Sequence, residues 1–122
     1  MKIKHTALLS RLSKEDEFSL ESESIQTQKA MLEEYASSHG FKNIIHYSDD
    51  GYSGTSFDRP DFKRLVSDIE CGLIDTVIVK DLSRLGRDYL QTGYYTEQYF
   101  SLHNVLTAKL YESNNDMLNQ NK

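Results

Sequence analysis

Serine and arginine side chains follow each of the first three strands that the sequence predicts. Guanidinium groups stay charged at any working pH and match phosphate oxygens with two parallel hydrogen bonds. A serine hydroxyl held among them is a candidate nucleophile for phosphoryl transfer. The residues concerned are Ser10, Arg11 and Ser13 after the first strand, Asp50, Ser53 and Arg59 after the second, and Ser83, Arg84 and Arg87 after the third. This pattern indicates a site that acts on a phosphate ester.

The sequence shows neither a phosphate-binding glycine motif nor a metal-binding cluster. Neither Gly-x-x-x-x-Gly-Lys-Ser/Thr nor Gly-x-Gly-x-x-Gly occurs, and no acidic metal-binding cluster stands out. The histidines are scattered singly, at positions 5, 39, 46 and 103. We therefore expect no cofactor and no metal, so that arginines must stabilise the charge of a phosphoryl transition state.

Hydrophobic patterning predicts strands and helices in alternation along the chain. The predicted strands are 2–9, 44–47, 76–79 and 105–110, and the predicted helices begin at Ile25, Pro60 and Asp88 and end before Gly40, before Gly72 and at Leu102. The polar segment between Ser13 and Ser24 is predicted to be a loop.

The order β-α-β-α-β-α-β predicts an α/β fold, with a mainly parallel sheet between two layers of helices. The β-branched run 76–79 is typical of a strand buried on both faces. Ligands of such sheets bind beyond the carboxyl ends of the strands. The serines and arginines described above lie at those ends.

Length and composition restrict the class of protein further. The 122 residues fit one domain, the apolar runs are too short to span a bilayer, and no signal peptide is evident. One cysteine, Cys71, excludes an internal disulfide, so that the cytoplasm is the expected compartment. The net charge of −5 argues against a globally basic DNA-binding surface, although it allows a local cluster of arginines.

Five motifs in order resemble the serine recombinases, the resolvase/invertase family of site-specific DNA recombinases. They are Arg11-Leu12-Ser13, Ser24-Ile25-Gln26-Thr27-Gln28, Asp50-Gly51-Tyr52-Ser53-Gly54, Phe57-Asp58-Arg59-Pro60 and Lys80-Asp81-Leu82-Ser83-Arg84-Leu85-Gly86-Arg87. The third and fifth motifs resemble the forms that occur in the large serine recombinases of transposons and integrated elements. The resemblance covers roughly Ala7 to Phe100 and implies a resolvase-like catalytic domain.

The resemblance also implies the role of each site residue. Ser13 would attack a DNA phosphodiester and form a covalent link to the 5′ phosphate, without ATP or metal. Arg11, Arg84 and Arg87 would surround the scissile phosphate. The remaining positions that match the family are one further active-site arginine, Arg59, and the supporting residues Gln28, Asp50, Ser53 and Ser83. DNA would be the partner, and the full-length enzyme would assemble into dimers and tetramers, with no membrane involved.

Several alternatives remain open from the sequence. Ser10 competes with Ser13 for the role of nucleophile, and the register Arg-x-Ser favours Ser13. The group that accepts the serine proton is not evident. Tyr95 and Tyr99, spaced i, i+4 on the third predicted helix, are interpreted as packing residues. A recombination tyrosine is disfavoured, because the histidine and arginine pattern of tyrosine recombinases is absent. A phosphoacceptor receiver domain has a similar architecture, but Ser10 and Arg11 stand where it needs an acidic pair for a metal.

The sequence departs from the family in three places. Leu9 stands where the family usually has tyrosine, and the segment 105–110 lacks the usual arginine. The chain ends at Lys122, before the family's dimerisation helix and DNA-binding domains. We therefore expect a catalytic domain over 1–111 and a frayed polar tail over 112–122. The isolated chain is expected to be inactive on its own and to bind DNA weakly. A non-catalytic remnant that modulates an intact recombinase is the alternative.

Overall fold

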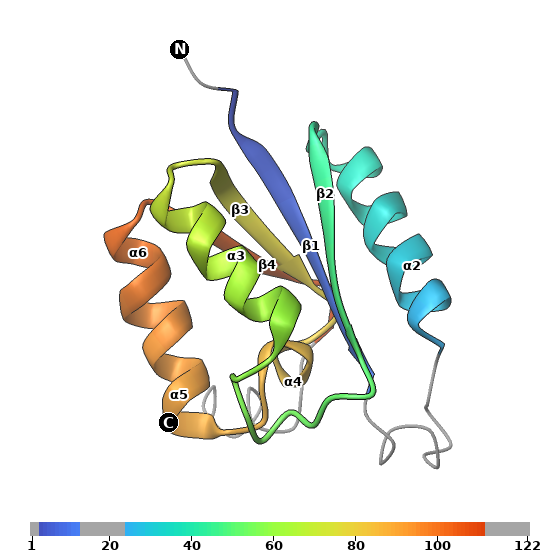
Figure 1. Cartoon of the computed structure of the whole chain (residues 1–122). Coiled ribbons are helices and arrows are strands. Elements are labelled where there is room, and N and C mark those ends of the chain that lie inside the picture. The colour runs from blue at the N-terminus through green and yellow to red at the C-terminus, as the bar shows by residue number, and fades with distance from the viewer. Residues whose placement is uncertain (1–2, 13–23, 112–122) are drawn as a thin grey trace.

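Four parallel strands form one sheet in the order β2-β1-β3-β4, as the computed structural model shows (Figure 1). The structure describes residues 3–12 and 24–111. The strands are β1 (His5–Leu12), β2 (Ile44–Asp50), β3 (Ile74–Val79) and β4 (Leu106–Lys109). The predicted α/β class is confirmed, and every strand pair in the sheet is parallel.

The first two strands reach further toward their carboxyl ends than the sequence predicts. Strand β1 starts at His5 and continues to Leu12, and β2 continues to Asp50. The apolar pattern stops earlier, but backbone pairing does not depend on polarity, and the ladder includes Arg11 opposite Asp49. As a result, Arg11 lies in a strand and not in the loop that follows it.

Helix α2 (Ile25–Ser38) covers one face of the sheet, as Figure 1 shows on the side of β2. Its apolar stripe packs Leu32 and Ala36 against Leu8 and Ile78 of the two central strands. The helix begins at a side-chain cap, because the Ser24 hydroxyl accepts a hydrogen bond from the Thr27 N–H at 3.1 Å. The predicted helix over this stretch is confirmed.

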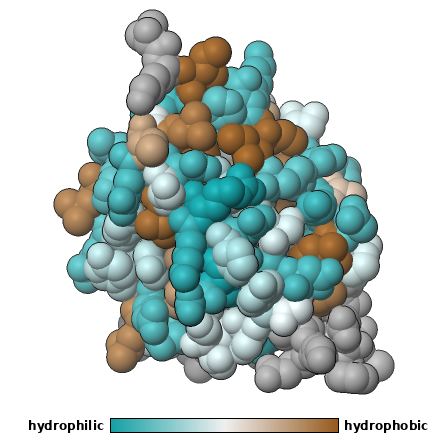
Figure 2. All heavy atoms as spheres, in the orientation of Figure 1, coloured by the Kyte–Doolittle hydropathy of each residue, from teal (hydrophilic) through white to brown (hydrophobic). Residues whose placement is uncertain are grey.

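Helix α3 (Pro60–Glu70) covers the opposite face together with the helix that precedes β4. Phe62, Leu65 and Ile69 are buried, spaced as one stripe of a helix, and belong to the larger core cluster with Val77 and Val79. The surface of the molecule on the side of α3 is mostly hydrophilic, with hydrophobic residues in separate patches (Figure 2). The sheet therefore lies between two layers of helices, as predicted.

The third predicted helix is continuous but not regular. It consists of α5 (Tyr89–Gly93), the π-helical segment η1 (Tyr94–Tyr99) and α6 (Phe100–Leu102). Asp88 caps its start by accepting hydrogen bonds from the N–H groups of Leu90 and Gln91. Tyr95 and Tyr99 pack against the core cluster, which agrees with their interpretation as packing residues. The π-helical turn was not predicted, because apolar spacing does not distinguish i→i+4 from i→i+5 bonding over six residues.

A short helix after β3 was also not predicted. This helix, α4 (Leu82–Leu85), is a single turn capped by Asp81, whose carboxylate accepts a hydrogen bond from the Ser83 N–H at 2.9 Å. Four residues are too few to show a helical period. Helix α4 places Ser83 and Arg84 beside β1. Among the described residues, no helix is long and apolar enough to cross a membrane.

Gly86 gives the first testable prediction, because a β-carbon there would lie 2.2 Å from Cζ of Phe57. That ring packs against Phe62 and Tyr95, with ring centroids 5.0 Å apart in each pair, and has little room to move. Gly86→Ala should lower the free energy of unfolding by about 1–3 kcal/mol through overpacking.

Gly93→Ala is the matched control. Gly93 is helical and its β-carbon would meet nothing within 4 Å, so that alanine should raise the free energy of unfolding by about 0.5–1 kcal/mol. Urea unfolding monitored by circular dichroism measures both variants. Equal effects of the two substitutions would show that the Phe57 contact does not constrain residue 86.

Candidate active site

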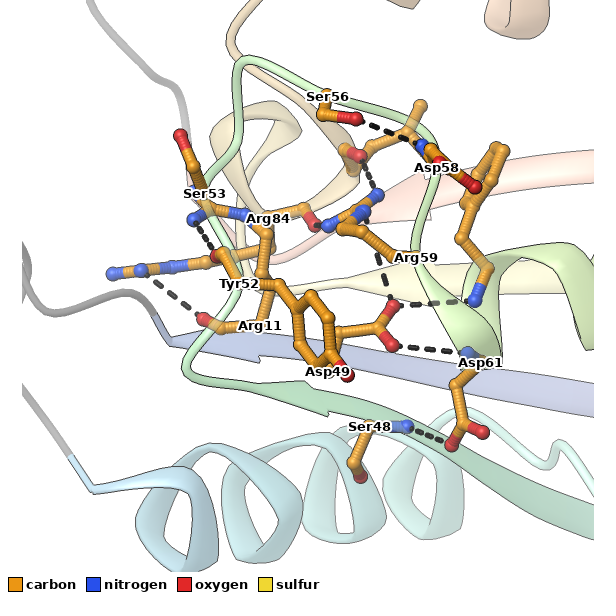
Figure 3. Close-up of polar contacts among 12 residues, drawn as sticks. Arg11, Ser48, Asp49, Tyr52, Ser53, Ser56, Asp58, Arg59, Asp61 and Arg84 are labelled. Carbon is orange, nitrogen blue, oxygen red and sulfur yellow. Dashed lines mark hydrogen bonds and ion pairs between the residues drawn. The ribbon is translucent and has the colours of Figure 1, made fainter.

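Three segments of the chain meet at the carboxyl edge of the sheet, because β1 lies between β2 and β3. They are the end of β1, the loop 51–59 between β2 and α3, and residues 80–87, which include α4. Crevices at this edge are where parallel sheets bind ligands. Figure 3 shows side chains from all three segments close together.

The Arg11 guanidinium joins two of these segments. Arg11 is completely buried, and its Nε and Nη2 atoms donate hydrogen bonds to the Ser83 carbonyl at 3.2 and 2.6 Å. Its Nη1 donates to the Tyr52 carbonyl at 3.2 Å (Figure 3). Because a buried charge is costly unless it is hydrogen-bonded, these carbonyls fix the loop 51–59 and α4 around the end of β1.

Gln28 and Arg84 bind the backbone of Arg11. The Gln28 amide accepts from the Arg11 N–H at 3.4 Å and donates to the Arg11 carbonyl at 3.0 Å, so that α2 is attached to the end of β1. Nη1 of Arg84 donates to the same carbonyl at 3.3 Å. Both side chains are buried. The structure therefore brings Gln28, Arg84 and Arg11 together.

Arg59 is buried beside two aromatic rings that contact each other, and it faces the backbone of α4. Its Cζ lies 5.5 and 5.2 Å from the ring centroids of Phe57 and Phe62. The guanidinium donates hydrogen bonds to the carbonyls of Arg84 and Leu85. With 1% of its surface exposed, Arg59 supports α4 and does not point into solvent.

Asp49 is the charged partner of Arg59, with 3.8 Å between Oδ2 and Nε (Figure 3). Its carboxylate also accepts hydrogen bonds from the N–H groups of Asp61 and Phe62, at 2.9 and 3.2 Å, in the first turn of α3. Burial raises the pKa of the Asp49 carboxyl, although these N–H groups and Arg59 lower it. Burial lowers the pKa of Arg59, and the Asp49 charge opposes that shift.

Sequence reasoning selected Asp50 and missed Asp49. Asp50 is exposed, whereas only 1% of Asp49 is exposed. A signal was present in the sequence: Asp49 shares the inward face of β2 with the fully buried Tyr47, two residues earlier. Pro60 then marks a helix start, whose free N–H groups need an acceptor.

The other predicted residues lie at the rim of the site. Ser83 is half-buried and its hydroxyl donates to the Asp81 carboxylate. Ser53 is also half-buried, with its hydroxyl 2.9 Å from the Thr55 hydroxyl. Arg87 is exposed, and its backbone N–H donates to the Gly54 carbonyl at 2.6 Å.

The two candidate nucleophiles differ in what the structure says of them. Ser13 lies outside the described residues, directly after Leu12 at the end of β1. Ser10 is fully buried in the sheet, and its hydroxyl has no hydrogen-bond partner in the described part of the chain. A phosphodiester in solvent therefore has no access to the Ser10 hydroxyl.

Acidic and histidine side chains do not form a metal centre within residues 3–12 and 24–111, where no group of three or more such ligands occurs. Asp81, which follows β3, caps α4. Three arginines lie around the end of β1: Arg11 and Arg84 are buried, whereas Arg87 is exposed.

Fold and site together define a three-layer α/β domain that gathers arginines at the carboxyl edge of a parallel sheet. The chain belongs to the resolvase family, because the family model described as "Resolvase, N terminal domain" matches residues 6–112. The resemblance to serine recombinases is confirmed, and this result decides against a receiver domain.

Individual proteins agree with this assignment. A "Putative DNA recombinase" of Bacillus subtilis (strain 168) is 36% identical over 81 residues, which are 66% of this chain and 15% of that protein. The chain thus spans a small part of this relative. The crystal structure of the N-terminal catalytic domain of TP901-1 integrase matches with a TM-score of 0.77 and 32% identity, over 88% of this chain and 77% of that one.

A resolvase family site-specific recombinase from Streptococcus pneumoniae shares the fold, with a TM-score of 0.68. It is 23% identical, and the match covers 88% of this chain and 72% of that chain.

Asp49→Asn tests the importance of the buried carboxylate. The asparagine amide would place an N–H group against another donor, from α3 or Arg59, and leave a buried donor without an acceptor. This should lower the free energy of unfolding by about 1–3 kcal/mol. Asp50→Asn, the same change at an exposed neighbour, should alter it by less than about 0.5 kcal/mol. Chemical unfolding at neutral pH compares the two, and equal losses would contradict the assignment.

The effect of Asp49→Asn should also depend on pH. The folded protein holds the Asp49 proton more tightly than the unfolded chain, because burial raises the pKa. That stabilisation is fully present below about pH 3.9, the ordinary aspartate value, and is lost as the pH rises through the folded pKa. The stability difference between wild type and Asp49→Asn should therefore be largest in acid and shrink toward neutral pH. A difference that grows with pH would contradict this sign.

Proposed function

We propose that this chain is the catalytic domain of a site-specific DNA recombinase, which cleaves and rejoins DNA through a covalent 5′-phosphoserine at Ser13. The resolvase family assignment supports the reaction class. The observation that carries the proposal is the convergence of three chain segments on the last residues of β1. Arg84 Nη1 lies 3.3 Å from the Arg11 carbonyl, two residues before Ser13 in the sequence.

The chemistry exchanges one phosphodiester for another. The Ser13 oxygen attacks the phosphorus, the serine proton leaves, and the bond to the 3′ oxygen of the adjoining nucleotide breaks. The released 3′ oxygen takes a proton and becomes a hydroxyl. In the reverse direction, a 3′ hydroxyl attacks the phosphoserine and regenerates Ser13. Each step conserves the number of phosphate ester bonds, so that resealing the strand needs no ATP.

Arginines have two kinds of role in this proposal. Arg84 and Arg87 stabilise the charge that builds on the phosphate oxygens in the pentacoordinate transition state. Arg11 is completely buried and all three of its guanidinium nitrogens bind backbone carbonyls, so that its role is to hold the loop 51–59 and α4 in place around the phosphate. Arg59 is a positioning residue, because it contacts the backbone of α4 and is almost completely buried.

DNA is the proposed partner, and assembly of the full enzyme into dimers and tetramers is the proposed route to strand exchange. The chain is acidic overall, so that its attraction for DNA would come from the arginines at the carboxyl edge alone. We propose that the isolated chain binds DNA weakly and that it acts in the cytoplasm as part of a larger enzyme. A non-catalytic remnant of this family is the alternative, and the following experiment separates the two.

A graft onto a related recombinase tests the proposal. Residues 1–112 replace the N-terminal catalytic domain of TP901-1 integrase, whose fold matches with a TM-score of 0.77. The graft is incubated with a nicked duplex that carries that integrase's own site, so that cleavage releases a short strand and traps the covalent complex. Denaturing gels detect the adduct, and mass spectrometry of the DNA-linked peptide identifies the residue attached.

Ser13→Ala should abolish the covalent adduct and leave DNA binding nearly unchanged. Ser10→Ala should retain the adduct, because the buried Ser10 hydroxyl has no partner to lose and no access to DNA. A folded, DNA-binding graft that forms no adduct would favour the non-catalytic remnant. An adduct that survives Ser13→Ala, or that disappears in Ser10→Ala, would overturn the assignment of the nucleophile.

A further inference from the structure

Gly54 lies at the point where the side chains of two arginines approach the loop 51–59. It is buried, and the arginines come from different elements: Arg11 from β1 and Arg87 from the segment after α4. A β-carbon built on Gly54 would lie 2.7 Å from Cγ of Arg87. It would also lie 2.9 Å from both Cζ and Nη2 of Arg11. Real β-carbons essentially never approach other heavy atoms this closely.

The backbone beside Gly54 binds the same two arginines. The Gly54 carbonyl accepts a hydrogen bond from the Arg87 N–H at 2.6 Å, and the Tyr52 carbonyl accepts from Nη1 of Arg11 at 3.2 Å. The loop therefore holds both residues through main-chain atoms while its surface at position 54 lies against their side chains. Main-chain hydrogen bonds and close packing at position 54 thus both link this loop to the positions of Arg11 and Arg87.

Neither arginine can yield to a new side chain without moving its guanidinium. Arg11 is held on its other side by two hydrogen bonds to the Ser83 carbonyl. The Arg87 contact is at Cγ, close to a backbone fixed by the Gly54 carbonyl, so that a shift there moves the whole outer part of the side chain. A methyl group at position 54 would thus displace one or both charged groups.

We propose that Gly54 is a positioning residue for the reaction: the absence of a side chain there sets the place of the Arg87 guanidinium beside the phosphate and of the Arg11 guanidinium that holds the loop 51–59 and α4 around it. This inference rests on the proposed function, because it assumes that Arg87 contacts the scissile phosphate. One glycine would thus determine how the guanidinium groups of Arg11 and Arg87, which come from different elements, lie relative to each other.

Gly54→Ala in the graft tests the proposal. At saturating DNA, the single-turnover rate of strand cleavage should fall about 100-fold, since a displacement of about 1 Å from the productive geometry can have that effect. The dissociation constant for DNA should change little, because most of the binding energy comes from the rest of the enzyme. Ile69→Val, a core change at the far end of α3 that also lowers stability, should leave the cleavage rate unchanged.

A double-mutant cycle with Arg87→Ala shows whether Gly54 acts through the arginine. In the Arg87→Ala background, Gly54→Ala should lower the rate by about tenfold or less, because one of its two targets is already gone. An undiminished 100-fold loss would overturn the proposal, as would a cleavage rate unaffected by Gly54→Ala. Loss of the cooperative thermal transition in Gly54→Ala would overturn it too, by making Gly54 a requirement for folding.

Side-chain NMR of the 122-residue chain provides a readout that does not depend on cleavage. The Nε–H signal of Arg11, which reports its bond to the Ser83 carbonyl, should shift or broaden in Gly54→Ala and remain in place in Ile69→Val. If the wild-type graft forms no adduct but this signal moves, the proposed function fails and the positioning contact stands. If the graft forms the adduct and the signal does not move, the positioning role alone fails.

Discussion

A buried guanidinium is the constraint on which the carboxyl edge of this sheet depends. Arg11 is completely buried, and a buried cation is tolerated only where acceptors surround it. The acceptors are backbone carbonyls of Tyr52, in the loop 51–59, and of Ser83, in α4, which are far apart in the sequence. The loop 51–59 and α4 must therefore both approach the end of β1, and this approach brings Ser53, Ser83 and Arg84 to the same edge of the sheet.

Helix α4 is stabilised by the same principle. A single helical turn leaves most of its carbonyl groups without partners inside the helix. In this protein the carbonyls of Ser83, Arg84 and Leu85 accept hydrogen bonds from Arg11 and Arg59. Two buried arginines thus provide the hydrogen-bond donors that further helical turns would otherwise provide. The carbonyls of α4 are the acceptors that the burial of these arginines requires. These hydrogen bonds also position the Arg84 side chain, although only the backbone carbonyl of Arg84 takes part in them.

Sequence patterns predicted the fold well where a feature repeats and poorly where it occurs once. The β-branched run of β3 and the apolar stripes of α2 and α3 recur over two or more periods, and each appears in the structure as expected. Helix α4 and the π-helical turn are too short to repeat. The choice of Asp50 over Asp49 has another cause: the motif fixes a local register, whereas the buried face of β2 decides which carboxylate meets Arg59.

The carboxyl edge separates arginines that support the structure from those that are open to a ligand. Arg59 is paired with Asp49 and packs beside Phe57 and Phe62, so that its charge acts inside the protein. Arg87 is exposed at the rim. A rigid inner layer of this kind lets an acidic protein present cationic groups at one place without the self-repulsion of a broadly basic surface. Contact with an anion would then depend on the geometry of this edge more than on the net charge of the chain.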